Sequence, residues 1–436
     1  MTSREVPEPL EVEDVRRQTV HSSFSHVLGD LADALHSGAL VFDREFSTES
    51  VARPTTAIVP ASAKGEDDLL VKSVEERAAA LRRLEVYVMI GMVSSGALTS
   101  FFNGMVFQLS PAWSSGGSTA FEANIVVTYV LALLVFTFEA LASGLTHENR
   151  SALQQRLSCK FMLKLAIPSA LDVFITGLAM LAVAFAQPAL VSILKATVQV
   201  LSIALISRFI LHKKQKWSVW CCLYGVVVGV TIIFVNVLCF KDGGHKFAPG
   251  NQALGVLMAC VAGGLGAARN LLEAALLDDE DFPPGALLLA ESMVSALAAI
   301  PLGAILFASL GSGLTDSLDN LRVTAKETAF TPIVLSIMVT AYGKDAGKFW
   351  MIKYTSAQRA KVLALVFPFG TWAVGLAVFY AGGRNHSPHF GLGFEWPGSF
   401  VLLIGFMIIL ISNLCIILLK MKMLPWCTTI DKNCCC

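Results

Sequence analysis

Ten apolar segments, each long enough to cross a bilayer, run through the sequence from residue 85 to residue 420. A transmembrane helix needs about 20 mainly apolar residues to span the hydrocarbon core. Lipid offers the backbone no hydrogen-bond partners, so spanning segments of this length are helical. We therefore predict an all-α polytopic membrane protein with ten transmembrane helices, at residues 85–108, 123–144, 162–184, 188–211, 217–239, 252–276, 284–310, 329–350, 355–381 and 398–420.

The composition supports this class and excludes several others. Hydrophobic residues make up 55% of the chain and charged residues 15%, whereas a soluble domain has about 25% charged residues. Lys+Arg and Asp+Glu number 33 each, so the formal net charge is zero. A disordered protein, a basic nucleic-acid-binding domain and a disulfide-stapled secreted domain are excluded. We expect membrane lipid around the chain and no nucleic acid partner.

The two ends of the chain differ from the apolar region between them. Residues 1–80 lack a spanning segment and are predicted to form a cytosolic, largely disordered tail, with an amphipathic helix over Leu69–Leu84. Lys and Arg are more frequent in the loops on the side of the N-terminus, which places both termini in the cytosol. Residues 421–436 form a second, Cys-rich cytosolic tail. We expect S-palmitoylation at Cys434, Cys435 and Cys436, with inert tail cysteines as the alternative.

The apolar segments divide into two halves of five, residues 85–239 and residues 252–420. The last segment of each half follows a Trp, Trp217 in the first half and Trp396 in the second. Five spans per half give the halves opposite orientations, and such inverted repeats are typical of transporters with a binding site near the bilayer midplane. Chance similarity between apolar helices is the alternative.

One stretch of the first half carries a resemblance to a known family. The segment KATVQVLSIALISR, from Lys195 to Arg208, is followed by a basic turn and Trp217. Over residues 165–238 the chain resembles the drug/metabolite transporter superfamily, in its nucleotide-sugar transporter and sugar-phosphate translocator branch. The resemblance implies that Lys195 faces the substrate. It also places Arg269, within GGLGAARNLLEAALL, at the family's inner-face arginine.

The second half departs from that branch. Phosphate translocators of the family carry an adjacent basic pair deep in the ninth span, whereas here Arg359 and Lys361 are one residue apart and nearer the start of the span. The segment SAQRAKVLALVFPFGTWAVGL also resembles the chloroquine-resistance-transporter-like branch. This second resemblance implies cationic or neutral metabolites, drugs or peptides as substrates.

Charged groups inside the predicted spans are the main candidates for a binding site. A charge at bilayer depth costs several kcal/mol, so such groups face a cavity or pair with one another. The spans contain eleven candidates: Glu139, Asp172, Lys195, Arg269, Glu273, Glu291, Lys344, Asp345, Lys348, Arg359 and Lys361.

The basic candidates each have two interpretations. Lys195 either contacts a substrate phosphate or forms a salt bridge to an acid such as Asp172. Arg269 either grips an anionic group or pairs with Glu273 at i, i+4 on the same helix. Lys344 and Lys348 share a helix face, and both are candidates to line the site. The alternative for Lys348 is that its side chain reaches the membrane interface.

Three further residues complete the candidate substrate-binding set. Lys361 lies deeper in its span than Arg359 and is the better candidate of that pair. Asn103 is a candidate polar cap on the site, with a packing role as the alternative. Tyr342 is a candidate for stacking on a nucleobase, although aromatic residues in spans are more often packing groups or interface anchors.

The combined prediction is an antiporter that works by alternating access. Its expected substrate is a small-molecule organic anion, either a nucleotide sugar or a sugar phosphate. The alternative is a carrier of cationic or neutral solutes. No hydrolase or nucleotide-binding motif occurs, so we expect neither an enzyme nor a cofactor. His386 and His389 lack further ligands, so we expect no metal site. The resemblance implies an endomembrane, Golgi or ER before plastid or vacuole. The sequence leaves a homodimer open.

Overall fold

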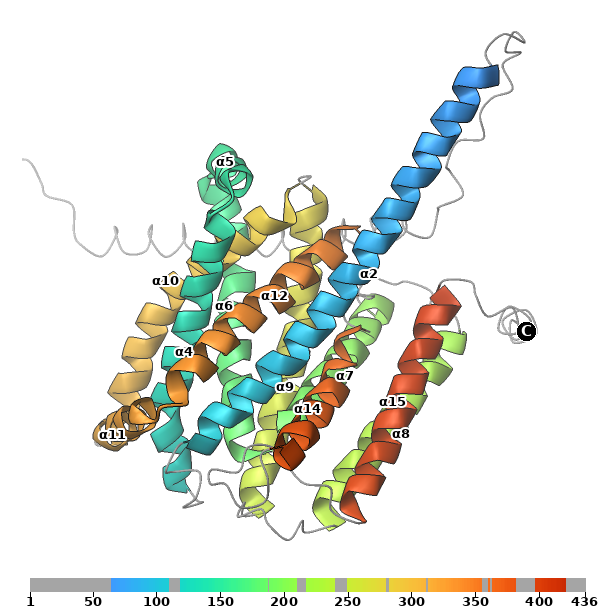
Figure 1. Ribbon diagram of the computed structural model, residues 1–436. Helices are drawn as coiled ribbons and strands as arrows, with labels where there is room; N and C mark the ends of the chain where they lie inside the picture. The colour runs from blue at the N-terminus through green and yellow to red at the C-terminus, as the bar shows by residue number, and fades with distance from the viewer. Residues whose placement is uncertain are drawn as a thin grey trace, which may run out of the picture. The chain divides into compact units, whose positions relative to one another are not determined.

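The computed structural model describes residues 64–109, 118–186, 188–209, 217–239, 249–279, 282–310, 313–354, 360, 363–381 and 397–420. Within these ranges every regular element is a helix and no strand occurs. Most of the helices run side by side as a bundle (Figure 1). Eight of them are long and apolar enough to cross a membrane. The prediction of an all-α polytopic membrane protein is therefore confirmed.

The eight helices that are both long and apolar enough are α2 (Lys64–Leu109), α4 (Ser118–Gly144), α6 (Cys159–Phe185), α7 (Pro188–Phe209), α8 (Trp217–Cys239), α9 (Pro249–Asp279), α10 (Pro284–Leu310) and α15 (Gly398–Lys420). Each corresponds to one of the apolar segments expected from the sequence, with the last two residues of the segment 188–211 outside the described part of the chain. Hydropathy predicts these spans well because the requirement to face lipid acts on each segment separately.

The remaining two expected spans are α12 (Phe330–Tyr354) and α14 (Phe367–Ala381). The helix α12 is long enough to cross a bilayer, but its C-terminal half carries Lys344, Asp345, Lys348 and Lys353. The helix α14 has 15 residues and rises about 22 Å, less than the roughly 30 Å of a hydrocarbon core. The count of ten spans and the repeat of two five-helix halves therefore stay predictions.

Three features of the helices differ from the sequence expectation. The amphipathic helix expected over Leu69–Leu84 is continuous with the first span, because α2 is one helix of 46 residues. Two short helices without spanning length, α5 (His147–Arg156) and α11 (Gly313–Lys326), lie between spans. The boundary expected between the N-terminal tail (residues 1–80) and the first five-helix half (residues 85–239) falls inside α2. Most of the N-terminal tail and the whole Cys-rich tail lie outside the described residues.

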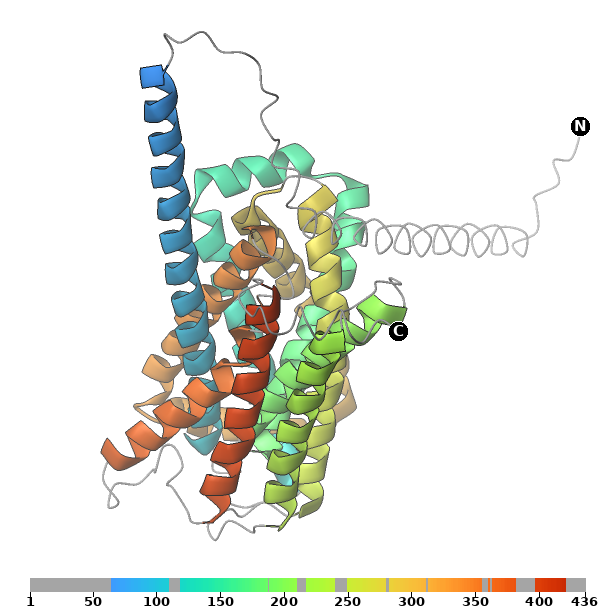
Figure 2. The same cartoon turned by 90° about the vertical axis from the view of Figure 1, so that its right-hand side faces the viewer.

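Small residues hold the last helices of the two expected halves, α8 and α15, against each other. The two helices lie side by side in both views (Figures 1 and 2). A Cβ atom on Gly229 would lie 2.9 Å from the carbonyl oxygen of Gly405, and one on Gly225 would clash with the Ser412 hydroxyl. In lipid, helices associate through such close packing of small residues. These glycines therefore set the distance between α8 and α15.

Candidate functional site

A cavity of about 190 Å³ lies between α2, α4, α6, α7, α9 and α12, with Ala364 and Phe367 closing it from the side of α14. Part of its wall is apolar, formed by residues such as Val135, Ile175 and Ile337. Its remaining lining is polar and includes seven charged side chains: Glu139, Asp172, Lys195, Arg269, Lys344, Asp345 and Lys348. This cavity is the candidate functional site.

Five of the residues proposed from the sequence to bind substrate line this cavity: Asn103, Asp172, Lys195, Arg269 and Lys344. Tyr342 does not line it. Its ring packs edge to face on Phe138 with the two centroids 6.4 Å apart, so the ring has a packing contact where stacking on a nucleobase was expected. The remaining candidates, Lys361 and the lipidation site Cys434–Cys436, lie outside the described residues.

The guanidinium of Arg269 is surrounded by carboxylates from three helices. Arg269 on α9 forms an ion pair with Asp172 on α6. Its Nε lies 2.6 Å from Oε1 of Glu273, one turn along α9, and 2.9 Å from Oε1 of Glu291 on α10. The sequence alternative of an i, i+4 pair with Glu273 is therefore present, together with two ion pairs that join α9 to its neighbours.

Lys348 on α12 extends the same network. Its Nζ lies 2.8 Å from Oε1 of Glu273, and the residue is only 6% exposed. The alternative in which Lys348 reaches the membrane interface is therefore wrong. Pairing with Glu273 compensates the burial of the Lys348 ammonium, because a buried charge is tolerated only when it is paired.

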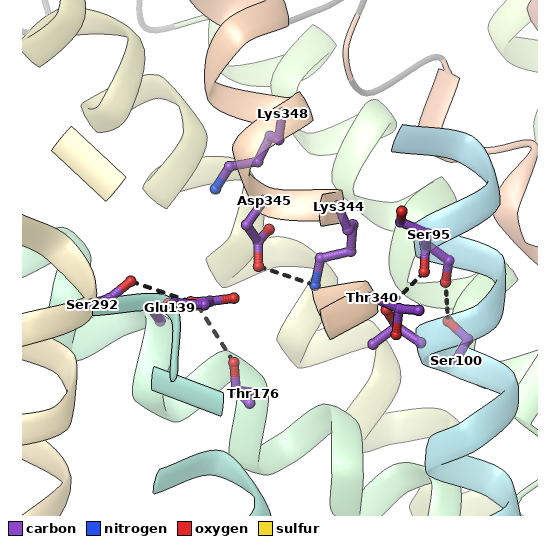
Figure 3. A network of polar contacts seen from close by, with 12 residues as sticks. Ser95, Ser100, Glu139, Thr176, Ser292, Thr340, Lys344, Asp345 and Lys348 are labelled. Carbon is purple, nitrogen blue, oxygen red and sulfur yellow. Dashed lines mark hydrogen bonds and ion pairs between the residues drawn. The ribbon is translucent and has the colours of Figure 1, made fainter. Parts of the chain in front are cut away.

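A second group of charges lies on α12 and α4 (Figure 3). The Nζ of Lys344 lies 3.2 Å from Oδ2 of Asp345. Glu139 is 2% exposed, and its Oε2 accepts a hydrogen bond of 3.2 Å from the Ser292 hydroxyl. The other carboxylate oxygen of Glu139 has no hydrogen-bond partner among the described residues. Glu139 therefore brings a buried, only partly satisfied negative group to the cavity.

Lys195 differs from the other cations of the cavity. The sequence alternative of a salt bridge to Asp172 does not form, because Asp172 pairs with Arg269. Lys195 makes no ion pair or side-chain hydrogen bond with any residue of the described ranges, and it lines the cavity from α7. Its backbone is held tightly against α9, since a Cβ atom on Gly263 would lie 2.6 Å from the Lys195 carbonyl oxygen.

The charges around the cavity nearly cancel. The four cations are Lys195, Arg269, Lys344 and Lys348, and the five carboxylates are Glu139, Asp172, Glu273, Glu291 and Asp345, which leaves one formal negative charge in excess. Among the described cations of the cavity, Arg269, Lys344 and Lys348 therefore pair with carboxylates and Lys195 does not. Pairing removes most of the positive potential that would attract a polyanion.

Small polar residues of the cavity were not identified from the sequence. The hydroxyls of Ser100 on α2 and Ser192 on α7 lie 3.1 Å apart and share a hydrogen bond. Thr176 donates a hydrogen bond of 3.4 Å to Asp172. Serine and threonine are common in tightly packed membrane helices, so no sequence pattern distinguishes those that face a cavity from those that face a neighbouring helix.

The comparisons with known proteins leave the family open. No protein-family model matches the chain, and no curated protein matches it. A search of solved structures finds a chain described as "Crystal structure of protein", which is 18% identical and superposes with a TM-score of 0.39. The match covers 76% of this chain and 99% of the other. With that score and identity, the match carries no functional argument.

Proposed function

We propose that the protein is a membrane transporter that works by alternating access on a small polar solute of neutral or positive net charge. The observation that supports this proposal is a cavity inside a bundle of apolar helices, lined by charges of both signs that nearly cancel. Ionisable groups within a membrane bundle usually mark a solute pathway. The proposal follows the chloroquine-resistance-transporter-like alternative of the sequence analysis.

The size and charge of the cavity argue against a nucleotide sugar. A volume of about 190 Å³ is below the roughly 300–1,000 Å³ of pockets that hold drug-sized ligands. A diphosphate needs several available cations, whereas Arg269, Lys344 and Lys348 are each paired with a carboxylate. Antiport of nucleotide sugars or sugar phosphates is the second candidate, and the unpaired Lys195 is the observation that favours it.

The ion pairs suggest which contacts change during transport. Arg269 connects α6, in the first expected half, with α9 and α10 in the second. Lys348 adds α12 to the same network. If the two halves rock around the cavity, as in transporters built from inverted repeats, the Arg269–Asp172 pair is a contact that has to break or move. A bound solute shifts this equilibrium only if it binds the two states differently.

We further propose the cellular setting expected from the sequence. The chain resides in an endomembrane, Golgi or ER before plastid or vacuole, with both termini in the cytosol. The positive-inside bias of Lys and Arg supports this orientation. Labelling of single cysteines in Arg322→Cys and Arg150→Cys variants, in sealed microsomes, tests it: the expected membrane-impermeant reaction is at residue 150 and not at residue 322. Reaction at residue 322 alone contradicts it.

Uptake by proteoliposomes tests the transport function. The full-length chain is reconstituted, and radiolabelled uridine diphosphate glucose, glucose 6-phosphate, a primary amine and a neutral amino acid are offered in turn. We expect protein-dependent uptake of the amine or the amino acid and none of the two phosphorylated solutes. Uptake of uridine diphosphate glucose would support the second candidate. No protein-dependent uptake of any solute would contradict both.

A further inference from the structure

We propose that the substrate is a zwitterion with an apolar body, whose acidic group binds Lys195 and whose ammonium group binds Glu139 and Asp345. This inference rests on the proposed transport function and names the class of solute that the cavity accepts. It is carried by two charged side chains of opposite sign that have no ion-pair partner among the described residues and line one cavity, Lys195 on α7 and Glu139 on α4.

The positive position is the ammonium of Lys195. Its charged neighbours in the cavity are Lys344, Arg269, Asp172 and Asp345. Both carboxylates of that set already have a cation, because Asp172 pairs with Arg269 and Asp345 with Lys344. Lys195 therefore offers one full positive charge and three hydrogen-bond donors to a solute, without breaking an existing ion pair.

The negative position combines Glu139 with Asp345. The charged neighbours of Glu139 in the cavity are Asp345, Lys344 and Asp172. Lys344 pairs with Asp345, and no cation contacts Glu139 among the described residues. The unpartnered carboxylate oxygen of Glu139 belongs to a side chain that is almost wholly buried. An ammonium donor at this place would supply the missing partner.

The two positions come from different sides of the cavity. Lys195 is on α7, which packs mainly on α9 and α14, whereas Glu139 is on α4, which packs mainly on α10, α11, α6 and α12. The two helices also lie apart in the bundle (Figure 1). The two ends of a zwitterion can therefore each pair with one of these side chains.

The apolar part of the cavity wall indicates the rest of the solute. It includes the apolar side chains of Val135, Ile175, Met180, Val191 and Ile337. An apolar body gains free energy by leaving water for such a wall. Together with a volume of about 190 Å³, this favours a solute of the size of a single amino acid with an aliphatic side chain.

A matched set of three solutes tests this binding mode. Proteoliposomes containing the full-length chain are preloaded with unlabelled L-leucine, and entry of labelled L-leucine is measured. Leucinamide, which keeps only the ammonium group, and N-acetyl-leucine, which keeps only the carboxylate, are added as competitors. We expect each to compete at least about tenfold more weakly than leucine, because each leaves one charged position of the cavity without a partner.

Two variants identify the position that each end occupies. In Lys195→Met, leucinamide is expected to compete as well as leucine, since the carboxylate no longer has a partner. In Glu139→Gln, N-acetyl-leucine is expected to compete nearly as well as leucine. Lys326→Met and Glu327→Gln, which change exposed residues at the end of α11, are the matched controls and should retain the wild-type order. Loss of folding alone cannot produce these opposite changes in selectivity.

The outcomes separate this inference from the proposed function. If leucine does not exchange while the primary amine does, or if leucinamide matches leucine in the wild-type chain, the zwitterion is refuted and the transporter of cationic solutes stands. If the two variants still exchange leucine and keep the wild-type order of the competitors, the assignment of the two positions is refuted. If no solute of either set is carried, the proposed function fails as well.

Discussion

Replacing Arg269 by glutamine should destabilise the bundle strongly. The Arg269 side chain is 12% exposed and faces Asp172, Glu273 and Glu291. In Arg269→Gln these three carboxylates keep one cation, Lys348, which contacts Glu273. Removing one partner of a buried ion pair costs about 3–5 kcal/mol, because the other charge stays buried and uncompensated. We therefore expect a loss of this size, seen as a fall of several degrees in the thermal midpoint.

A compensating variant tests the cause of that loss. In Arg269→Gln with Asp172→Asn, the network loses one positive and one negative charge, so its balance returns to that of the wild-type chain. We expect the double variant to regain about 1–3 kcal/mol relative to Arg269→Gln, as is usual for directly coupled sites. The thermal midpoint of detergent-solubilised protein is measured by fluorescence-detected size exclusion. Arg322→Gln, on the exposed face of α11, is the control and should leave the midpoint unchanged.

Two results would refute this reasoning. A midpoint of Arg269→Gln equal to that of the wild-type chain would mean that the guanidinium does not hold the three carboxylates together. A double variant whose losses simply add would mean that Arg269 and Asp172 do not interact. Either result would return Arg269 to the set of cations available to an anionic solute.

Two further predictions concern regions outside the cavity. Gly229→Ala should destabilise the α8–α15 pair by about 1–3 kcal/mol, because the new methyl group would meet the Gly405 carbonyl and Ile409. The thermal midpoint measures this loss. The control is Gly264→Ala, where a Cβ atom meets nothing within 4 Å, and it should leave the midpoint unchanged or raise it. Acyl-exchange labelling of the chain from native membranes should modify the Cys434–Cys436 tail, and a variant with serine at these three positions should lose the label; an unlabelled wild-type tail would reject the lipidation.

The sequence predicts the spans far better than it predicts the partners of the charges. Hydropathy is a local property, so the apolar segments at α8 and α15 coincide closely with the helices. The amphipathic pattern of α11, with charged residues between buried ones, was present in the sequence, but its length excluded it from a search for spans. The continuity of α2 was missed because its first part is polar and resembles the preceding tail.

The pairing of charges depends on how helices meet, and spacing along one helix reveals only part of it. The Arg269–Glu273 pair follows from i, i+4 spacing, whereas Asp172 lies 97 residues away from Arg269 and reaches it only through the packing of α6 on α9. Lys348 finds Glu273 for the same reason. The orientation of Tyr342 toward Phe138 likewise depends on the packing of α12 against α4, which the sequence of α12 alone cannot predict.

The central claim is a cavity in which, among the residues that the structure describes, Arg269, Lys344 and Lys348 are paired and Lys195 is not. Its most direct test is competition by a polyanion. In proteoliposomes that exchange an amine or amino acid, excess uridine diphosphate glucose is added on the side from which the labelled solute enters. The experiment is repeated with the protein reconstituted in the opposite orientation. The account predicts that the exchange rate stays unchanged, because Arg269, Lys344 and Lys348 are held by carboxylates. Strong inhibition that disappears in Arg269→Gln would show that these cations are available to an anion, and would contradict it.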